Sequence, residues 1–233
     1  MPKKRIIFAA GLMTLYFSAS AAAAPAEFQF SLAFSPALPT GSFHDALDMT
    51  VWGGSLSFAF RPSGSPVLIG TSLVFGAYDT DHWEAWLGLT DPDVLVDVRT
   101  TNGLLAWNLF LRFQPERGFL RPYLDLFAGL HVLTTTTQIG EGDSDDADGD
   151  FYVNNASDTV FSFGAGAGLQ FPLLRFINQE GRRVFSIDLD LGARYARGGE
   201  AYYLVEAGGE GAFDSRTSRT DMLTLSAGLT FVF

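Results

Sequence analysis

The stretch Phe185-Ser-Ile-Asp-Leu-Asp-Leu-Gly-Ala-Arg-Tyr195 decides how this chain of 233 residues folds. Its bulky apolar residues stand at alternate positions, and most residues between them are small or charged. Alternate residues of a β-strand share one face, so the pattern predicts a strand with one apolar face and one polar face. The charged positions on the polar face are Asp188, Asp190 and Arg194.

Seven further segments repeat this alternation: residues 27–35, 52–60, 67–77, 105–113, 123–132, 161–171 and 223–233. Large apolar residues gather on one face, and Gly, Ser, Ala and isolated charges gather on the other. A soluble β-sandwich buries its bulky face, whereas a small membrane barrel turns that face toward lipid and fills its narrow interior. We therefore predict an all-β fold, an eight-stranded antiparallel up-and-down transmembrane β-barrel over residues 25–233. The soluble sandwich is the alternative.

Composition excludes several other classes of protein. The absence of cysteine excludes a disulfide scaffold and a zinc finger. An apolar content of 47% with only 18% charged residues is unlike a disordered chain. A formal charge of −11 does not suit a surface that neutralises nucleic-acid phosphates, so we expect no nucleic acid as partner.

The first 24 residues are typical of a cleaved secretory signal peptide. Lys3, Lys4 and Arg5 precede an apolar stretch, and small residues near Ala24 offer a cleavage site. The alternative is an uncleaved anchor, but the apolar run is shorter than the roughly 20 residues that span a bilayer. We expect export and integral placement in a bacterial outer membrane, with a mature chain that begins near Ala24 or Pro25.

Connector lengths also suit a barrel. Half of the mature arginines, including Arg61 and Arg121, lie in or next to the shorter connectors, which span residues 61–66, 115–119 and 172–183. Of the 26 acidic residues, 20 lie in the longer connectors, which span residues 36–50, 78–103, 133–158 and 196–221. Outer-membrane barrels have short periplasmic turns and long outer loops, so we expect the acidic connectors outside the cell.

The end of the chain resembles an assembly signal. Ser226, Gly228, Phe231 and Phe233 run in the order polar, glycine, apolar, terminal aromatic, which is similar to the signal that the outer-membrane assembly machinery recognises. Together with the strand after Arg121 and the glycine-rich run 163–169, the chain resembles the outer-membrane β-barrel family of the OmpA, OmpX and OmpW type. Membership implies insertion by that machinery. It does not imply one activity, because the family includes anchors, adhesins, channels and enzymes.

Charged residues on the polar faces form the first candidate site. A tight turn around Gly118 is expected to place Arg112 opposite Asp125, and Arg194 to pair with Asp190 on its own strand. Ion pairing offsets much of the cost of burying such charges. We interpret the set as a salt-bridged plug, with a polar constriction in a narrow pore as the alternative. The predicted lumen network comprises Arg112, Asp125, His131, Asp188, Asp190 and Arg194.

The acidic run 141–150 forms the second candidate site. Carboxylate oxygens are the ligands that calcium prefers. The run is not an EF-hand loop, because Asn155 stands where the final bidentate glutamate belongs. We interpret the run as a solvated acidic loop, since blocks of like charge repel one another, with a calcium site as the alternative. The candidate ligands are Asp143, Asp145, Asp146, Asp148 and Asp150.

No catalytic residues are predicted. Leu133 stands two residues after His131, so the His-x-Ser pairing of the lipid A deacylases is absent. His44 and His82 remain as histidines of the outer loops, beside Asp45 and Asp81. Catalysis would need a nucleophile and a base within hydrogen-bond reach, and the spacing predicts none.

We therefore expect a non-enzymatic outer-membrane barrel without a cofactor. Its acidic outer loops are predicted to serve surface interaction or envelope structure. The alternative is a narrow OmpW-like channel for small or hydrophobic molecules, and a lipid-modifying or proteolytic enzyme is a weaker third. Expected partners are outer-membrane lipid and lipopolysaccharide, the assembly machinery during insertion, and an external ligand or divalent cation.

Overall fold

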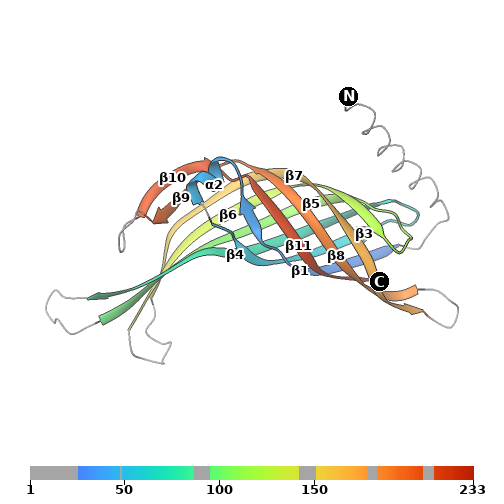
Figure 1. The fold of residues 1–233 in the computed structure, drawn as a ribbon, viewed down its shortest axis with the longest axis horizontal. Helices are drawn as coiled ribbons and strands as arrows, with labels where there is room; N and C mark the ends of the chain where they lie inside the picture. The colour runs from blue at the N-terminus through green and yellow to red at the C-terminus, as the bar shows by residue number, and fades with distance from the viewer. Residues whose placement is uncertain (1–25, 48, 87–94, 142–150, 178–182, 207–212) are drawn as a thin grey trace.

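A closed ring of antiparallel strands forms the body of the protein (Figure 1). The structure is a computed structural model that describes residues 26–47, 49–86, 95–141, 151–177, 183–206 and 213–233. Each ring strand pairs with the next one along the chain, and the last pairs with the first, as between Phe231 and Phe30. The ring strands are β1 (Glu27–Phe34), β3 (Trp52–Arg61), β4 (Val67–Trp86), β5 (Leu95–Phe113), β6 (Arg121–Glu141), β7 (Phe151–Ile177), β8 (Arg183–Gly198) and β11 (Met222–Val232).

The short strand β2 (Ala37–Pro39) is a continuation of β1. Phe34 pairs with Ala227 and Ala37 with Thr224, so the register along β11 is unchanged across the gap. Pro36 has no N–H to give to a ladder, which interrupts the strand without displacing it. The ring therefore has eight strands, and the predicted up-and-down barrel is confirmed.

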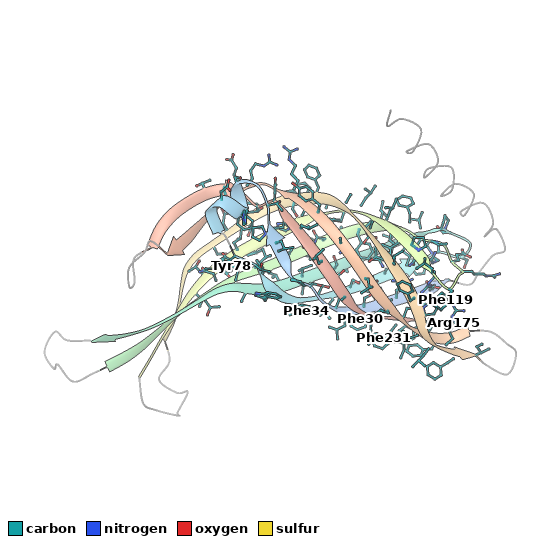
Figure 2. The ribbon with its side chains drawn as sticks, viewed as in Figure 1. Phe30, Phe34, Tyr78, Phe119, Arg175 and Phe231 are labelled. Atoms are coloured by element: carbon teal, nitrogen blue, oxygen red, sulfur yellow. The ribbon has the colours of Figure 1, made fainter. Side chains whose placement is uncertain are left out.

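The bulky faces of the strands point away from the barrel axis. Phe30, Phe34 and Phe231 lie along its outer wall (Figure 2), and Phe34 is 55% exposed. Charged and polar residues fill the interior instead. The soluble sandwich is therefore wrong, because a sandwich would bury the face that this molecule exposes.

Most of the long outer connectors are not loops. β4 and β5 stay paired from Ala77 opposite Gly103 to Trp86 opposite Leu95, and β6 and β7 stay paired out to Ile139 opposite Phe151. The expectation of loops over 78–103 and 133–158 is wrong for these parts. Runs such as Thr134–Thr137 have no bulky apolar face, yet β-branched residues favour extended backbone and the ladder continues without one.

The connector 172–183 is also shorter than expected. β7 continues to Ile177 and β8 begins at Arg183, with register shifts between Pro172 and Leu174 and again next to Ile177. The predicted connector begins at this proline, Pro172. Because it only removes one ladder hydrogen bond, a bulge absorbs it and the strand goes on.

One end of the barrel carries additional elements. The helix α2 (Ser42–Leu47) follows β2, and the hairpin of β9 (Glu200–Glu206) and β10 (Phe213–Arg219) lies beside it (Figure 1). Within the described ranges, no helix is long and apolar enough to cross a bilayer. Tyr78 lies toward this end, while Phe119 and Arg175 lie at the opposite end (Figure 2). We refer to the α2 end as the outer end and to the Phe119 end as the inner end.

Candidate functional site

An ion-paired row crosses the lumen at the level of Asp125. Arg112 and Asp125 are cross-strand neighbours because Gly118, with φ of 137°, reverses the chain between β5 and β6. Arg112 Nε donates to Asp125 Oδ1 (2.8 Å), and its Nη2 donates to Oδ2 (3.0 Å). The expected register of this pair is confirmed, and the two parallel bonds give the strong bidentate geometry of an arginine–carboxylate pair.

Arg194 reaches the same carboxylate. Its Nε and Nη2 donate to Asp125 Oδ2 at 3.0 and 2.7 Å, and its Nη1 donates to Ser72 Oγ at 3.1 Å. The expected pairing of Arg194 with Asp190 is wrong. Asp125, Gly166 and Arg194 stand in register on three neighbouring strands, and a Cβ on Gly166 would meet the Arg194 side chain. Because the middle residue has no side chain, Arg194 extends across it.

Asp190 collects donors from other strands. Arg112 Nη1 donates to its Oδ2 (3.3 Å), and Tyr123 Oη donates to its Oδ1 (2.7 Å). Gln170 Nε2 and Thr230 Oγ1 also donate to Oδ2, at 2.8 and 3.2 Å. The Arg112 guanidinium lies 3.6 Å from the centre of the Tyr123 ring, in cation–π geometry. This carboxylate therefore joins five strands of the ring.

A second polar layer lies toward the inner end. Asp188 pairs with Arg121, and Arg61 Nη2 donates to Gln114 Oε1 at 2.9 Å. Gln114 in turn donates to Gln170 Oε1 at 2.7 Å. Arg61 Nε lies 3.4 Å from a carboxylate oxygen of the buried Glu27. This layer closes the lumen between the ion-paired row and the inner turns.

Sequence reasoning missed part of this layer. It placed Arg61 in a short connector and Arg121 next to one, without assigning either to the lumen, and they are 1% and 2% exposed. Alternation along the strands could have predicted this burial, because residues two apart share one face. Arg61 shares a face with Ala59 and Arg121 shares one with Tyr123, and Ala59 and Tyr123 both face the lumen. Among the side chains that the structure describes, the strands then give the lumen equal numbers of opposite charges: Arg61, Arg112, Arg121 and Arg194 against Glu27, Asp125, Asp188 and Asp190.

His131 lies in the lumen but outside the ion-paired row. It is 2% exposed, and its Nδ1 has no hydrogen-bond partner among the described residues. Asn108 Oδ1 has none among them either. Both side chains line a cavity of about 60 Å³ next to the row, with Ser55, Ser57 and other small polar residues. Such a cavity has the size and polarity to hold a few ordered waters.

An apolar layer closes the outer end of the lumen. Phe43, from α2, is completely buried there, with residues contributed by strands and by the β9–β10 hairpin. The sequence placed residues 36–50 in an outer loop, and the helix and the inward-facing Phe43 were not expected. The layer consists of Ala37, Phe43, Val51, Tyr78, Leu104, Leu133, Val160, Ala201 and Met222.

The remaining candidate residues fall into two groups. The calcium candidates Asp143, Asp145, Asp146, Asp148 and Asp150 lie outside the described residues, as do residues 1–25 with the expected signal peptide. In the parts of the chain that are described, three or more metal-ligating side chains do not gather. The assembly-signal residues lie on or directly after β11, where Phe231 stacks on Phe30 at 6.2 Å and Gly228 pairs with Ala33: Ser226, Gly228, Phe231 and Phe233.

The two faces of β6 decide the class of protein. Asp125 is 1% exposed, while the adjacent Leu126 is 53% exposed, and this reversal of the soluble pattern recurs around the ring. A closed antiparallel ring with apolar outside and polar inside is the arrangement of an outer-membrane barrel. The protein is an eight-stranded outer-membrane β-barrel. It therefore has lipid as its surroundings.

The comparisons with known proteins give structural matches at low similarity. No family model and no curated protein matches the barrel sequence. Neisserial surface protein A is 15% identical with a TM-score of 0.38, and the match covers 89% of this chain and 97% of that one. Ail of Yersinia pestis, in complex with a heparin analogue, is 16% identical with a TM-score of 0.40 and the same coverage. AlkL is 16% identical with a TM-score of 0.35, over 90% of both chains. These values are too low to transfer a function to this barrel.

Proposed function

We propose that the protein is a closed, non-enzymatic outer-membrane barrel whose outer segments serve surface interaction or envelope structure. The observation that carries this proposal is the filling of the lumen at two separate levels. The ion-paired row and the layer of Arg61, Gln114 and Asp188 occupy the inner half, and Phe43 with its apolar neighbours occupies the outer mouth.

The energetics of the row support a closed lumen. A passing ion would have to separate Arg112 and Arg194 from Asp125, which leaves unpaired charges in a site that is almost free of solvent. Breaking a buried pair costs about 3–5 kcal/mol when one partner is lost. Uncharged solutes meet the apolar layer at the outer mouth instead. A narrow channel for small or hydrophobic molecules would therefore need both levels to rearrange.

The outer segments support a role at the cell surface. Long paired strands continue well beyond the Phe43 layer, as in β6 and β7, and the sequence between these two strands is acidic. Negative charge held away from the membrane suits contact with a basic partner or a divalent cation.

Conductance of the purified protein in planar bilayers tests the closed lumen. We expect no steady open level from the wild type. A variant with Phe43→Gly, Arg112→Ser, Asp190→Ser, Arg61→Ser and Gln114→Ser shortens side chains at the outer mouth, in the ion-paired row and in the inner layer. It is expected to conduct, which also verifies insertion. Far-UV circular dichroism checks that the variant retains β-structure. A reproducible open level from the wild type contradicts the closed barrel and favours the channel.

Calorimetry tests the proposed divalent-cation partner of the outer loops. We expect calcium to bind the purified barrel, and a variant with Asp143, Asp145, Asp146, Asp148 and Asp150 changed to asparagine to lose the heat. Magnesium serves as the comparison ion, because it holds its water more firmly than calcium does. Absence of heat at millimolar calcium would remove the cation from the proposal.

A further inference from the structure

Exposed arginines are rare at the outer end of the barrel. Among the arginines whose side chains are described, Arg61, Arg112, Arg121 and Arg194 belong to the lumen. Arg117 lies in the β5–β6 turn, and Arg175 donates to Gly118 O at the inner end. The remaining two, Arg197 and Arg219, meet at one spot on the outer rim. We asked what this pair is placed to bind.

A shallow groove on the outside of the barrel joins these arginines to lipid-facing aromatic rings. Arg197 is the cross-strand neighbour of Phe163, so it projects from the lipid-facing side of the wall. Phe161 and Phe163, 58% and 52% exposed, have ring centroids 6.3 Å apart. Gly199 N donates to Phe161 O at 2.9 Å, which brings the base of the β9–β10 hairpin against β7. The groove is lined by Val160, Phe161, Phe163, Arg197, Gly198, Gly199, Glu200 and Arg219.

The charges around the groove leave one cation uncompensated. Asp221 Oδ1 accepts from Arg219 Nη2 (3.3 Å) and from Gly198 N (3.1 Å), and Tyr195 Oη donates to its Oδ2 (3.5 Å). Glu200 stands opposite Arg219 in the hairpin register. Among the described residues, the ion pair of the groove is therefore the one between Arg219 and Asp221. Arg197 makes no ion pair with any described residue and is exposed.

The depth of the groove matches the boundary of a bilayer. Tyr195, two residues inward from Arg197 on the same face, is 46% exposed and turns its hydroxyl toward the polar side. Tyrosine in this position is characteristic of the membrane interface. An arginine just above it lies at the level of lipid headgroups, where its planar guanidinium can form two parallel bonds with a phosphate.

We propose that this groove binds a membrane lipid through its phosphate. Arg197 holds the phosphate, the pairing of Arg219 with Asp221 keeps that carboxylate from neutralising Arg197, and the acyl chain lies along Phe161 and Phe163. The proposal goes beyond a closed surface barrel, since it assigns a specific lipid site on the wall. The lipid site requires only that the strands lie in the membrane. A conducting lumen would therefore contradict the closed barrel but not the lipid site.

Lipid retention measured by native mass spectrometry tests the site. The barrel is reconstituted with phosphatidylglycerol or with an uncharged galactosyl diacylglycerol, and the lipids kept after detergent exchange are counted. Arg197→Gln is expected to lower retained phosphatidylglycerol about tenfold, the effect of losing one charge-assisted hydrogen bond of about 1.4 kcal/mol. Arg197→Lys is expected to keep part of it, and retention of the galactolipid is expected to be unchanged in every variant.

Arg117→Gln is the matched control, because it removes an exposed arginine at the inner end. The anomalous gel mobility of folded barrels confirms that each variant is assembled. Inorganic phosphate at millimolar concentration is expected not to displace the lipid, since the acyl contacts to the two phenylalanines supply part of the affinity. Equal retention by the wild type and Arg197→Gln, or displacement by phosphate alone, would overturn the proposed lipid site.

Discussion

Asp125 shows how single residues set the interior of this barrel. It accepts bonds from two arginines that come from opposite directions, and Gly166, its neighbour on β7, leaves the space through which one of them passes. The charge pattern alone could not identify the partner of Arg194, because the choice depended on the residue that stands between two strands. The pairing of Arg194 with Asp125 therefore depends on the lack of a side chain at Gly166 as well as on the charges.

Replacement of Asp125 by asparagine is expected to destabilise the protein strongly. Arg112 and Arg194 would keep their positive charges with one fewer buried carboxylate, and losing one partner of a buried pair costs about 3–5 kcal/mol. The free energy of unfolding, measured by urea titration in lipid vesicles, provides the comparison. Asp45→Asn on the exposed side of α2 is the control and is expected to change stability by less than about 0.5 kcal/mol. Similar losses for both variants would mean that water already screens the lumen.

At the scale of elements, β7 illustrates why one face of a strand carries glycine. Gly164, Gly166 and Gly168 face inward, and the spaces they leave are filled by Phe127, the Arg194 stem and Tyr123 from the two adjacent strands. Ala165 and Ala167 on the other face meet lipid. Because the inward positions of β7 have no side chains, large side chains from the adjacent strands β6 and β8 have room inside the barrel.

Replacement of Gly168 by valine is expected to prevent normal packing of the wall. A Cβ at this position would overlap the Tyr123 ring and hydroxyl and would also approach Leu191 O. Overpacking of this kind costs about 1–3 kcal/mol or more, and Tyr123 would lose its bond to Asp190. Ala167→Val, one residue away and facing lipid, is the control. The midpoint of thermal unfolding should fall for Gly168→Val and stay near the wild type for Ala167→Val; the reverse order would contradict the assigned faces.

The outer-end helix α2 is the second element with a testable role. Phe43 is its only described residue that is completely buried, and it anchors residues 37–51 in the mouth of the ring. Phe43→Ala is expected to release this segment while the ring remains intact, because the ring strands keep their own ladders. Limited proteolysis should then cut between residues 37 and 51 at least several times faster. Phe34→Ala, which removes a lipid-facing ring, is the control and should leave the cleavage rate unchanged.

At the scale of the whole molecule, the outward apolar side chains form a belt around the barrel. Inside the belt, polar residues fill the lumen toward the inner end and apolar residues fill it at the outer end. Trp52 lies at the outer edge of this belt, opposite Ala77 on β4, and Trp107 lies opposite Leu73, four residues further in. At about 3.3 Å per residue and a strand tilt near 40°, the second indole is roughly 10 Å deeper. Both side chains are exposed to the surroundings, at 61% and 46%.

Brominated lipids are expected to report this difference in depth. In proteins that retain one tryptophan each, with the other three replaced by phenylalanine, bromine placed deep in the acyl chains should quench Trp107 more than Trp52. Bromine near the headgroup should give the opposite order. Equal quenching of both residues by both lipids would contradict the proposed position of the membrane around the barrel.

The sequence by itself determined the class of fold, because strand periodicity depends only on neighbouring residues. Eight segments with a bulky face and a small or charged face specify the number of strands, their alternation and the side that meets lipid. It also identified most of the inward charges, and the turn at Gly118 paired Arg112 with Asp125. These inferences needed only a period of two and one short connection.

The tertiary structure decided the partners of Arg194, Asp190, Arg61 and Arg121, the position of Phe43 in the outer mouth and the meeting of Arg197 with Arg219. Most of these contacts join residues from strands that are not neighbours, such as Arg194 with Asp125, or from a connector that folds back on the ring. Such contacts depend on the stagger and closure of the whole barrel and on which side chains are absent between two partners. No local pattern contains that information, because closure is a property of all eight strands together.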